Sequence, residues 1–192
     1  MTEDTANAGV GDAPREATDL ADYLSDKTTI LPRLIGTEEA ATQIARLFHS
    51  SNGATFSLHF GNMTGKPYFA VSIYQDSEAR HSKWWNGKSL SELKLRAFIA
   101  SNRQLSEEPR NSIGLWYDTE NDRTYLEVTA TLSFYDKLDY TNAIGLGRRY
   151  NQIGIYDLEE RVYLSLGGTG ELPADTPPVL GRLPALQRGA KT

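Results

Sequence analysis

The stretch GLWYDTENDRTYLEVTA, residues 114–130, decides the fold because it aligns without a gap with SLHFGNMTGKPYFAVSI, residues 57–73. At this offset of 57 residues, the matched positions share their chemistry: Phe60 with Tyr117, Lys66 with Arg123, Tyr68 with Tyr125, and Val71 with Val128. Each copy is typical of a strand, a polar turn of about six residues and a second strand. A helical pattern follows each copy, so the sequence predicts two β-β-α repeats.

Patterns on both sides of the repeats complete the predicted fold. Thr37 is expected to cap a first helix that ends at Asn52. The capping box SLSE at residues 89–92 is expected to open a second helix, with Leu93 among its apolar positions, that ends near Asn102. A third helix is predicted to begin at Asp136. The last elements are a hairpin or a single kinked strand, residues 153–156 and 161–166. The predicted class is α+β, a mainly antiparallel sheet of five to six strands with three helices packed on one face.

The two ends differ from the middle in composition. Residues 1–29 are rich in acids and poor in large apolar side chains, which predicts a disordered acidic leader. Within it, Leu20, Tyr23 and Leu24 could form a short amphipathic turn that docks on the body or on a partner. Residues 30–166 are expected to be a single domain, and residues 167–192 a flexible tail rich in Gly and Pro. Removing residues 1–27 or 171–192 should then change stability by roughly 1 kcal/mol at most.

Composition and charge exclude several classes of protein. The chain of 192 residues has no cysteine, so disulfides and thiolate sites are excluded. The first residues are acidic and no apolar run of membrane-spanning length follows, so we expect a cytoplasmic protein without a membrane partner. The net charge of −5 comes from residues 1–40, which carry nine acids and three bases, whereas residues 41–166 carry fourteen of each. A neutral core disfavours non-specific binding of duplex DNA.

The segment RHSKWWNGK, residues 80–88, is the first candidate site, since it combines two of the three tryptophans with basic groups. Its candidate binding residues are Arg80, His81, Lys83, Trp84, Trp85 and Lys88. Exposed tryptophans beside cations suit an anchor in a protein interface or a platform on which a nucleic-acid base stacks. Adjacent side chains on an extended segment point to opposite sides, so one ring could instead cap the core. The sequence leaves these three interpretations open.

A second candidate site is the group Arg148, Arg149 and Asn151, near the end of the third predicted helix. The two arginines complement the helix dipole, and this is the simpler interpretation. Alternatively, the group could bind a carboxylate, a phosphate or the edge of a base. The glycines of residues 167–170 could cradle a phosphate, but without a following helix they are more typical of an exit from the sheet.

The sequence contains no recognisable catalytic motif. The three histidines, His49, His59 and His81, lack a second histidine at metal-ligand spacing. Glu127 and Asp118 could approach His59 or Arg123 across the sheet, but such pairs are common structural features. We therefore expect a protein that is not an enzyme and binds neither a cofactor nor a metal.

Four short stretches carry a resemblance to known proteins: NSIGLWYD (residues 111–118), TYLEV (124–128), GRRYNQIGIYD (147–157) and GGTG (167–170). They resemble pieces of small uncharacterised proteins associated with phages, plasmids and other mobile elements of bacteria. This resemblance implies a genomic setting and brings no catalytic residues. The sequence thus favours a non-enzymatic protein-binding protein with Trp84 and Trp85 as anchors. A nucleic-acid-binding accessory protein is the alternative, and a small enzyme with an unrecognised site is the second alternative.

Overall fold

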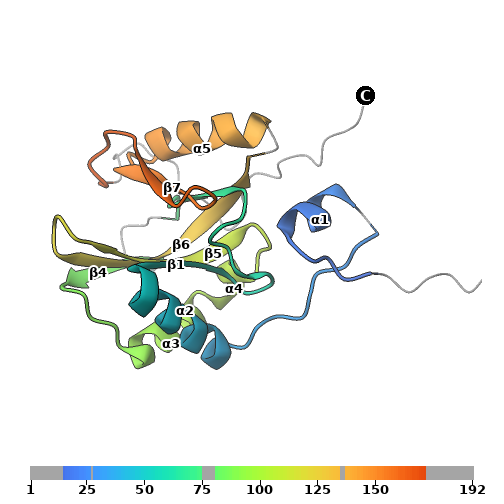
Figure 1. Cartoon of the computed structure of the whole chain (residues 1–192), viewed down its shortest axis with the longest axis horizontal. Coiled ribbons are helices and arrows are strands. Elements are labelled where there is room, and N and C mark those ends of the chain that lie inside the picture. The colour runs from blue at the N-terminus through green and yellow to red at the C-terminus, as the bar shows by residue number, and fades with distance from the viewer. Residues whose placement is uncertain (1–14, 27, 75–80, 135–136, 172–192) are drawn as a thin grey trace, which may run out of the picture.

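The computed structural model describes residues 15–26, 28–74, 81–134 and 137–171, which contain five helices and eight strands (Figure 1). The helices are α1 (Leu20–Ser25), α2 (Thr37–Ser51), α3 (Glu92–Ser101), α4 (Arg103–Ser106) and α5 (Lys137–Arg149). The strands are β1 (Gly53–Ser57), β2 (Gly61–Asn62), β3 (Tyr68–Val71), β4 (Ser82–Asn86), β5 (Asn111–Asp118), β6 (Arg123–Ser133), β7 (Gly154–Asp157) and β8 (Val162–Ser165). The α+β class is confirmed, although α1, α4 and the short strands raise the counts above those predicted.

The strands form one antiparallel sheet in the order β2-β1-β5-β6-β3-β7-β8, and β4 also pairs with β6. The hairpins β5–β6 and β7–β8 agree with the sequence prediction. The first predicted hairpin is wrong, because β1 pairs with β5 and β3 pairs with β6. Alternation of apolar residues defines which face of a strand is buried but not which strand lies beside it. Val71 and Val128 do share the same core, so the repeat is one of strand pattern and not of pairing.

Strands β3 and β4 are two parts of one interrupted strand along the same edge of β6. Val71 lies opposite Ala130, and Ser82 lies opposite Glu127. Only two residues of β6 separate these partners, but the chain uses ten residues, 72–81, to cross the gap. The polar segment that contains the first candidate site therefore re-enters the sheet as a regular strand.

The helix boundaries agree with those predicted from the sequence, but the capping residues of α2 and α3 differ from the predicted ones. The N-cap of α2 is Gly36 and not Thr37, while Asn52 ends the helix in the left-handed conformation, with φ of 60°. Helix α3 is capped by Ser91, whose hydroxyl accepts from the Lys94 amide at 3.4 Å, so the predicted capping box is displaced. Leu93 is 77% exposed and does not join the core. The predicted cap Asp136 lies outside the described residues.

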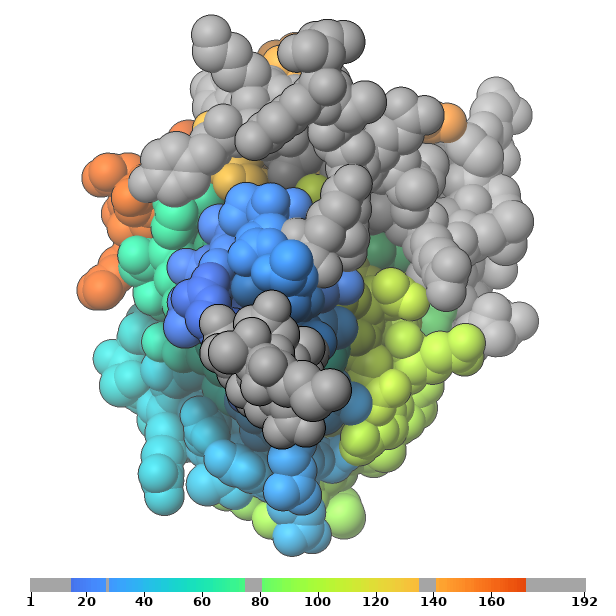
Figure 2. All heavy atoms as spheres, turned by 90° about the vertical axis from the view of Figure 1, so that its right-hand side faces the viewer, coloured from blue at the N-terminus to red at the C-terminus, as the bar shows by residue number. Residues whose placement is uncertain are grey.

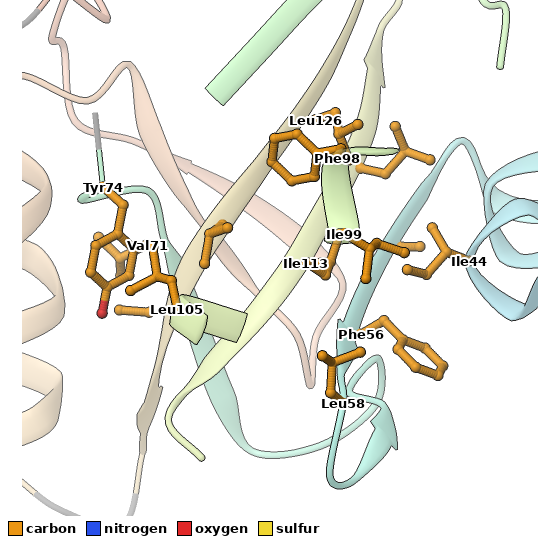
Figure 3. Packing of buried hydrophobic residues seen from close by; sticks show 14 of the residues in the cluster. Ile44, Phe56, Leu58, Val71, Tyr74, Phe98, Ile99, Leu105, Ile113 and Leu126 are labelled. Atoms are coloured by element: carbon orange, nitrogen blue, oxygen red, sulfur yellow. The ribbon is translucent and has the colours of Figure 1, made fainter. Parts of the chain in front are cut away.

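The main core lies between the helices and one face of the sheet, as predicted. Ile44 of α2 and Phe98 and Ile99 of α3 pack against sheet residues such as Phe56 and Ile113 (Figure 3). Ala143 of α5 belongs to the same cluster. Helices α2, α3 and α5 therefore cover the same face, even though α5 and α2 lie on opposite sides of the molecule in Figure 1. This is possible because the sheet is strongly curled.

The opposite face of the sheet is polar at its centre and is closed at one end by α1. Leu20 is fully buried with Met63, Tyr68 and Leu158 in a second, smaller core. The Ala21 amide donates a hydrogen bond to the Tyr68 hydroxyl at 2.9 Å. Figure 2 shows the blue residues of this segment seated on the body of the molecule.

The described part of the predicted leader, residues 15–26, is thus folded, and the domain begins before residue 30. Of the two possibilities left open for the segment with Leu20, Tyr23 and Leu24, the structure shows docking on the body. At the other end, the described residues 167–171 lie against Asn151, and the rest of the predicted tail lies outside the described residues.

A candidate binding surface on the concave face of the sheet

Four aromatic side chains lie on the face of the sheet opposite the main core, and we call them the aromatic surface: Trp84 of β4, Trp116 of β5, Tyr125 of β6 and Tyr163 of β8. The Trp116 and Tyr125 rings are stacked, with centroids 4.5 Å apart and planes at 12°. The Tyr163 ring centroid lies 6.3 Å from that of Trp116. Trp84 is 56% exposed and Tyr163 is 46% exposed. The rings therefore present an accessible surface built on strands.

The contact between Trp116 and Tyr163 shows that this face is concave. Strands β6, β3 and β7 separate β5 from β8 in the sheet order. In a flat sheet, with strands about 4.8 Å apart, the two rings would be separated by roughly 19 Å. The measured 6.3 Å requires that the sheet curl toward this face. Helices α2, α3 and α5, which pack on the main core, accordingly lie on the convex side.

Strand register explains why these rings meet. Tyr125 lies opposite Trp116 on one side and opposite Trp84 on the other. Cross-strand partners project from the same face, so the three side chains form a row across β5, β6 and β4. Gly154 makes room for the fourth ring, because a Cβ there would lie 2.4 Å from Cζ of Tyr163.

The Arg123 guanidinium lies over the Trp84 ring, 4.5 Å from its centroid. This contact orients the exposed indole and adds a cation–π interaction. Asp118 is the cross-strand partner of Arg123. Partial burial would raise the pKa of Asp118, but hydrogen bonds from Asn121 and Glu120 and the charge of Arg123 lower it overall. An ionised carboxylate therefore lies beside the arginine at this end of the sheet.

Glu127 lies on the same face and is half-buried. It accepts a hydrogen bond from the Ser72 hydroxyl at 2.6 Å and one from the Trp116 side chain. Burial raises the pKa of Glu127 above its ordinary value of 4.5, and these hydrogen bonds offset only part of the effect. Burial also raises the pKa of Tyr163 to about 12, with contributions from the charges of Asp118 and Glu127. The acids thus lie close to the rings.

The structure separates the residues of the first candidate site. Trp84 is exposed on the concave face, whereas Trp85 packs against the main core and its indole N–H donates to the Ser89 carbonyl at 2.7 Å. Lys83 is exposed on the Trp85 side of the strand. The predicted pair of anchors is therefore one exposed ring and one ring that caps the core.

The remaining residues of that site have structural contacts or lie elsewhere. His81 is half-buried and its Nδ1 lies 2.5 Å from Oδ1 of Asn102. Lys88 donates to the Asn52 side chain and lies 5.6 Å from the centroid of the Phe48 ring. Arg80 lies outside the described residues.

The second candidate site does not converge with the aromatic surface. Arg148 and Arg149 are exposed in the last turn of α5, where they complement the helix dipole. The Asn151 side chain donates to Oγ1 of Thr169 at 2.6 Å and to the Glu171 carbonyl at 2.8 Å. Asn151 therefore fixes the strand exit. A Cβ at Gly168 would lie 2.2 Å from the Gln152 carbonyl, so this glycine serves a close approach of backbones.

Sequence reasoning did not assign Trp116, Tyr125, Tyr163 or Glu127 to a binding site. The signal for the first two was present, since Trp116 and Tyr125 face each other in the predicted hairpin. Tyr163 could not be added, because its approach depends on the curl of the whole sheet. The suggested contact of Glu127 or Asp118 with Arg123 is confirmed for Asp118. His59 instead lies between the carbonyls of Pro32 and Glu107, at 3.2 and 2.9 Å.

An open groove of about 570 Å³ lies elsewhere, on α2, where Arg96 forms ion pairs with Glu38 and Glu92 at 3.2 and 3.4 Å. In the described ranges, no group of three or more acids and histidines could hold a metal ion. None of the helices there combines the length and apolar character needed to span a membrane. Searches against protein-family models, curated proteins and solved structures found no match.

Proposed function

We propose that this protein is a non-catalytic binding protein whose aromatic surface contacts another protein. The observation that carries the proposal is Trp84, an indole that is 56% exposed on a paired strand. Large aromatic side chains and arginine are enriched among the residues that dominate binding energy at interfaces. Trp84 and Arg123 supply both in one contact.

The surface is already ordered before a partner arrives. Trp84 is held by Arg123, and Trp116 and Tyr125 are held by stacking on each other. A partner would therefore not have to order these side chains, each of which would otherwise cost about 0.5–1.5 kcal/mol on immobilisation. Strand residues, in contrast to residues of a mobile loop, suit a contact of fixed shape.

The charges around the rings favour a protein over a nucleic acid. The ionised Asp118 carboxylate lies on the same face as Arg123 and offsets its charge, which makes the surface less attractive to phosphates. The stacked rings with an adjacent arginine still fit a single-stranded nucleic acid, which remains the alternative. The genomic setting in mobile elements, implied by the resemblance of residues 111–170, stays a prediction.

A matched pair of variants tests the proposal. Trp84→Ala removes the exposed indole, and Leu93→Ala removes a side chain that is 77% exposed on α3. The tagged protein is cross-linked in host cells, bound macromolecules are identified, and the recombinant partner is titrated against each variant. We expect Trp84→Ala to weaken binding by about 2 kcal/mol or more, and Leu93→Ala to leave it unchanged.

Equal binding by both variants would show that the aromatic surface is not the contact. Salt distinguishes the kind of partner, because neutralising phosphates gives a steep linear fall of log affinity with log salt. A steep slope of this kind, with a nucleic acid as the cross-linked species, would replace the protein partner by the alternative.

A further inference from the structure

Strand β4 has one edge paired with β6 and one edge free among the described residues. The Val128 amide donates to the His81 carbonyl at 2.9 Å, and the Gly87 amide donates to the Asp122 carbonyl at 2.7 Å. In an antiparallel ladder, hydrogen-bonded pairs alternate with pairs whose backbone groups point outward. The odd-numbered residues of β4 therefore bond to β6, and Ser82, Trp84 and Asn86 direct their N–H and C=O groups away from it.

No other strand in the described ranges pairs with β4. An unpaired edge is a template for another strand unless the protein blocks it. Figure 1 shows β4 beside β6 at the left-hand end of the molecule, away from α1 and α5. Within the described ranges, this edge of five residues, with an exposed tryptophan at its centre, has no strand partner.

We propose that the free edge of β4 pairs antiparallel with β4 of a second copy of this chain, with Trp84 opposite Trp84. A two-fold axis through this pair places Ser82 opposite Asn86 of the other copy, so all the outward-facing groups meet. About six hydrogen bonds would join the two copies. A self-complementary contact of this kind closes as a dimer. This inference does not depend on the proposed function.

The side chains favour this register over its neighbours. It places Lys83 opposite Trp85 of the other copy, so the ammonium meets an indole. Shifting the strands by two residues in one direction would place Lys83 opposite Lys83, and like charges directly opposite each other are destabilising. Shifting them in the other direction leaves Ser82 beyond the end of the partner strand. The sequence SKWWN is therefore complementary to itself in one alignment.

Pairing of this kind would join the concave faces of two copies. The two Trp84 rings would lie side by side at the axis, and each would continue into the stacked rings of its own copy. One partner could then contact both copies. The dimer is nevertheless a separate claim, because a monomer could still bind through Trp84.

The absence of cysteine from the chain allows a direct test by disulfide trapping. We expect a mixture of Ser82→Cys and Asn86→Cys variants of the full chain to form a covalent heterodimer on mild oxidation. Opposed Cα atoms in such a pair are about 5.5 Å apart, which suits a disulfide. Each variant alone should cross-link poorly, because identical positions would be roughly 13 Å apart. Thr119→Cys, in an exposed turn, measures random collision.

Sedimentation equilibrium of the unmodified chain and of Ser82→Pro provides an independent measurement. The Ser82 amide points away from β6, so proline removes a bond across the dimer and none within the sheet. We expect the apparent mass of the unmodified chain to approach twice that of Ser82→Pro at high concentration. A monomeric unmodified chain would overturn the proposal. The proposal would also be overturned if the mixture of Ser82→Cys and Asn86→Cys formed no more covalent dimer than Thr119→Cys, since any dimer would then use another surface.

Discussion

At the scale of single residues, Glu127 is a partly buried acid that lies next to the rings of the aromatic surface. Its carboxylate accepts from Ser72 and from the Trp116 side chain, so the pair of donors fixes its orientation. The same carboxylate helps to hold the Trp116 ring on which Tyr125 stacks. Glu127 therefore positions the aromatic surface from below.

Replacing Glu127 by glutamine tests this environment through the pH dependence of stability. The folded-state pKa of Glu127 is raised, so its favourable contribution is complete below the unfolded pKa, near 4.5, and is lost as pH rises through the folded pKa. Glu127→Gln has no such loss. We expect its unfolding free energy relative to the unmodified chain to increase as the pH rises above about 4.5.

Urea denaturation at several pH values measures this difference. Ser72→Ala provides a second variant, because loss of the donor should raise the folded pKa further and steepen the decline of stability with pH. A difference between Glu127→Gln and the unmodified chain that does not vary with pH would contradict the assigned environment.

At the same scale, the sequence proposed both tryptophans as anchors and left open that one ring caps the core; in the structure Trp84 is exposed and Trp85 packs against the core. It could not distinguish Trp84 from Trp85, since alternation gives opposite faces without saying which one is the core. The assignment follows from register, which places Trp85 opposite Thr124 and on the side of Leu126.

At the scale of elements, α1 shows how a short helix can be essential to one end of a sheet. Its six residues are too few to be stable alone, so tertiary contacts must hold it. Leu20 supplies these contacts, being fully buried against Tyr68 and Leu158. Because α1 packs in this way, we now expect removal of residues 1–27 to lower stability by more than the roughly 1 kcal/mol that the composition suggested.

We predict that Leu20→Ala lowers the unfolding free energy by about 2–5 kcal/mol, the range for truncating a buried leucine. Leu24 is only partly buried on the same helix, and Leu24→Ala is the matched control with a smaller expected loss. Chemical denaturation of both variants gives the comparison. Equal and small losses would mean that α1 contributes little to the folded state.

Other elements show where sequence reasoning succeeds and where it fails. The end of α2 at Asn52 follows from a local rule, since asparagine tolerates the left-handed conformation. The start of α3 at Ser91 and not Ser89 depends on which of two equivalent serines meets the helix amides, and the sequence treats both alike. The sequence did not predict that β1 pairs with β5, because no local feature of β1 specifies a partner strand so far away in the chain.

At the scale of the whole molecule, the curl of the sheet brings together residues that no local pattern connects. Tyr163 meets Trp116 across three intervening strands, and Gly154 leaves the space that this ring occupies. The fold class and the helix-covered face could be inferred from alternation and helical periodicity. The strand order and the curl could not, since both depend on non-local pairing.

We predict that Gly154→Ala loosens this closure and lowers the unfolding free energy by about 1–3 kcal/mol. A Cβ at this position would lie 2.4 Å from both the Leu164 carbonyl and Cζ of Tyr163, so β8 or the ring must move. Gly145→Ala is the control, because nothing lies within 4 Å of a Cβ there and alanine favours a helix. Denaturation and near-ultraviolet circular dichroism measure the two effects. Unchanged aromatic dichroism in Gly154→Ala would contradict the role given to Tyr163.

The interruption between β3 and β4 is a place where the sequence could change in evolution without disturbing the sheet. Because β6 fixes the register on both sides of the break, the ends at Val71 and Ser82 stay aligned whatever segment joins them. Two residues would suffice for a continuous strand, so the connection between Val71 and Ser82 is eight residues longer than the pairing with β6 requires. Segments of different length and chemistry could therefore replace the connection between β3 and β4 while the strands around the aromatic surface keep their pairing.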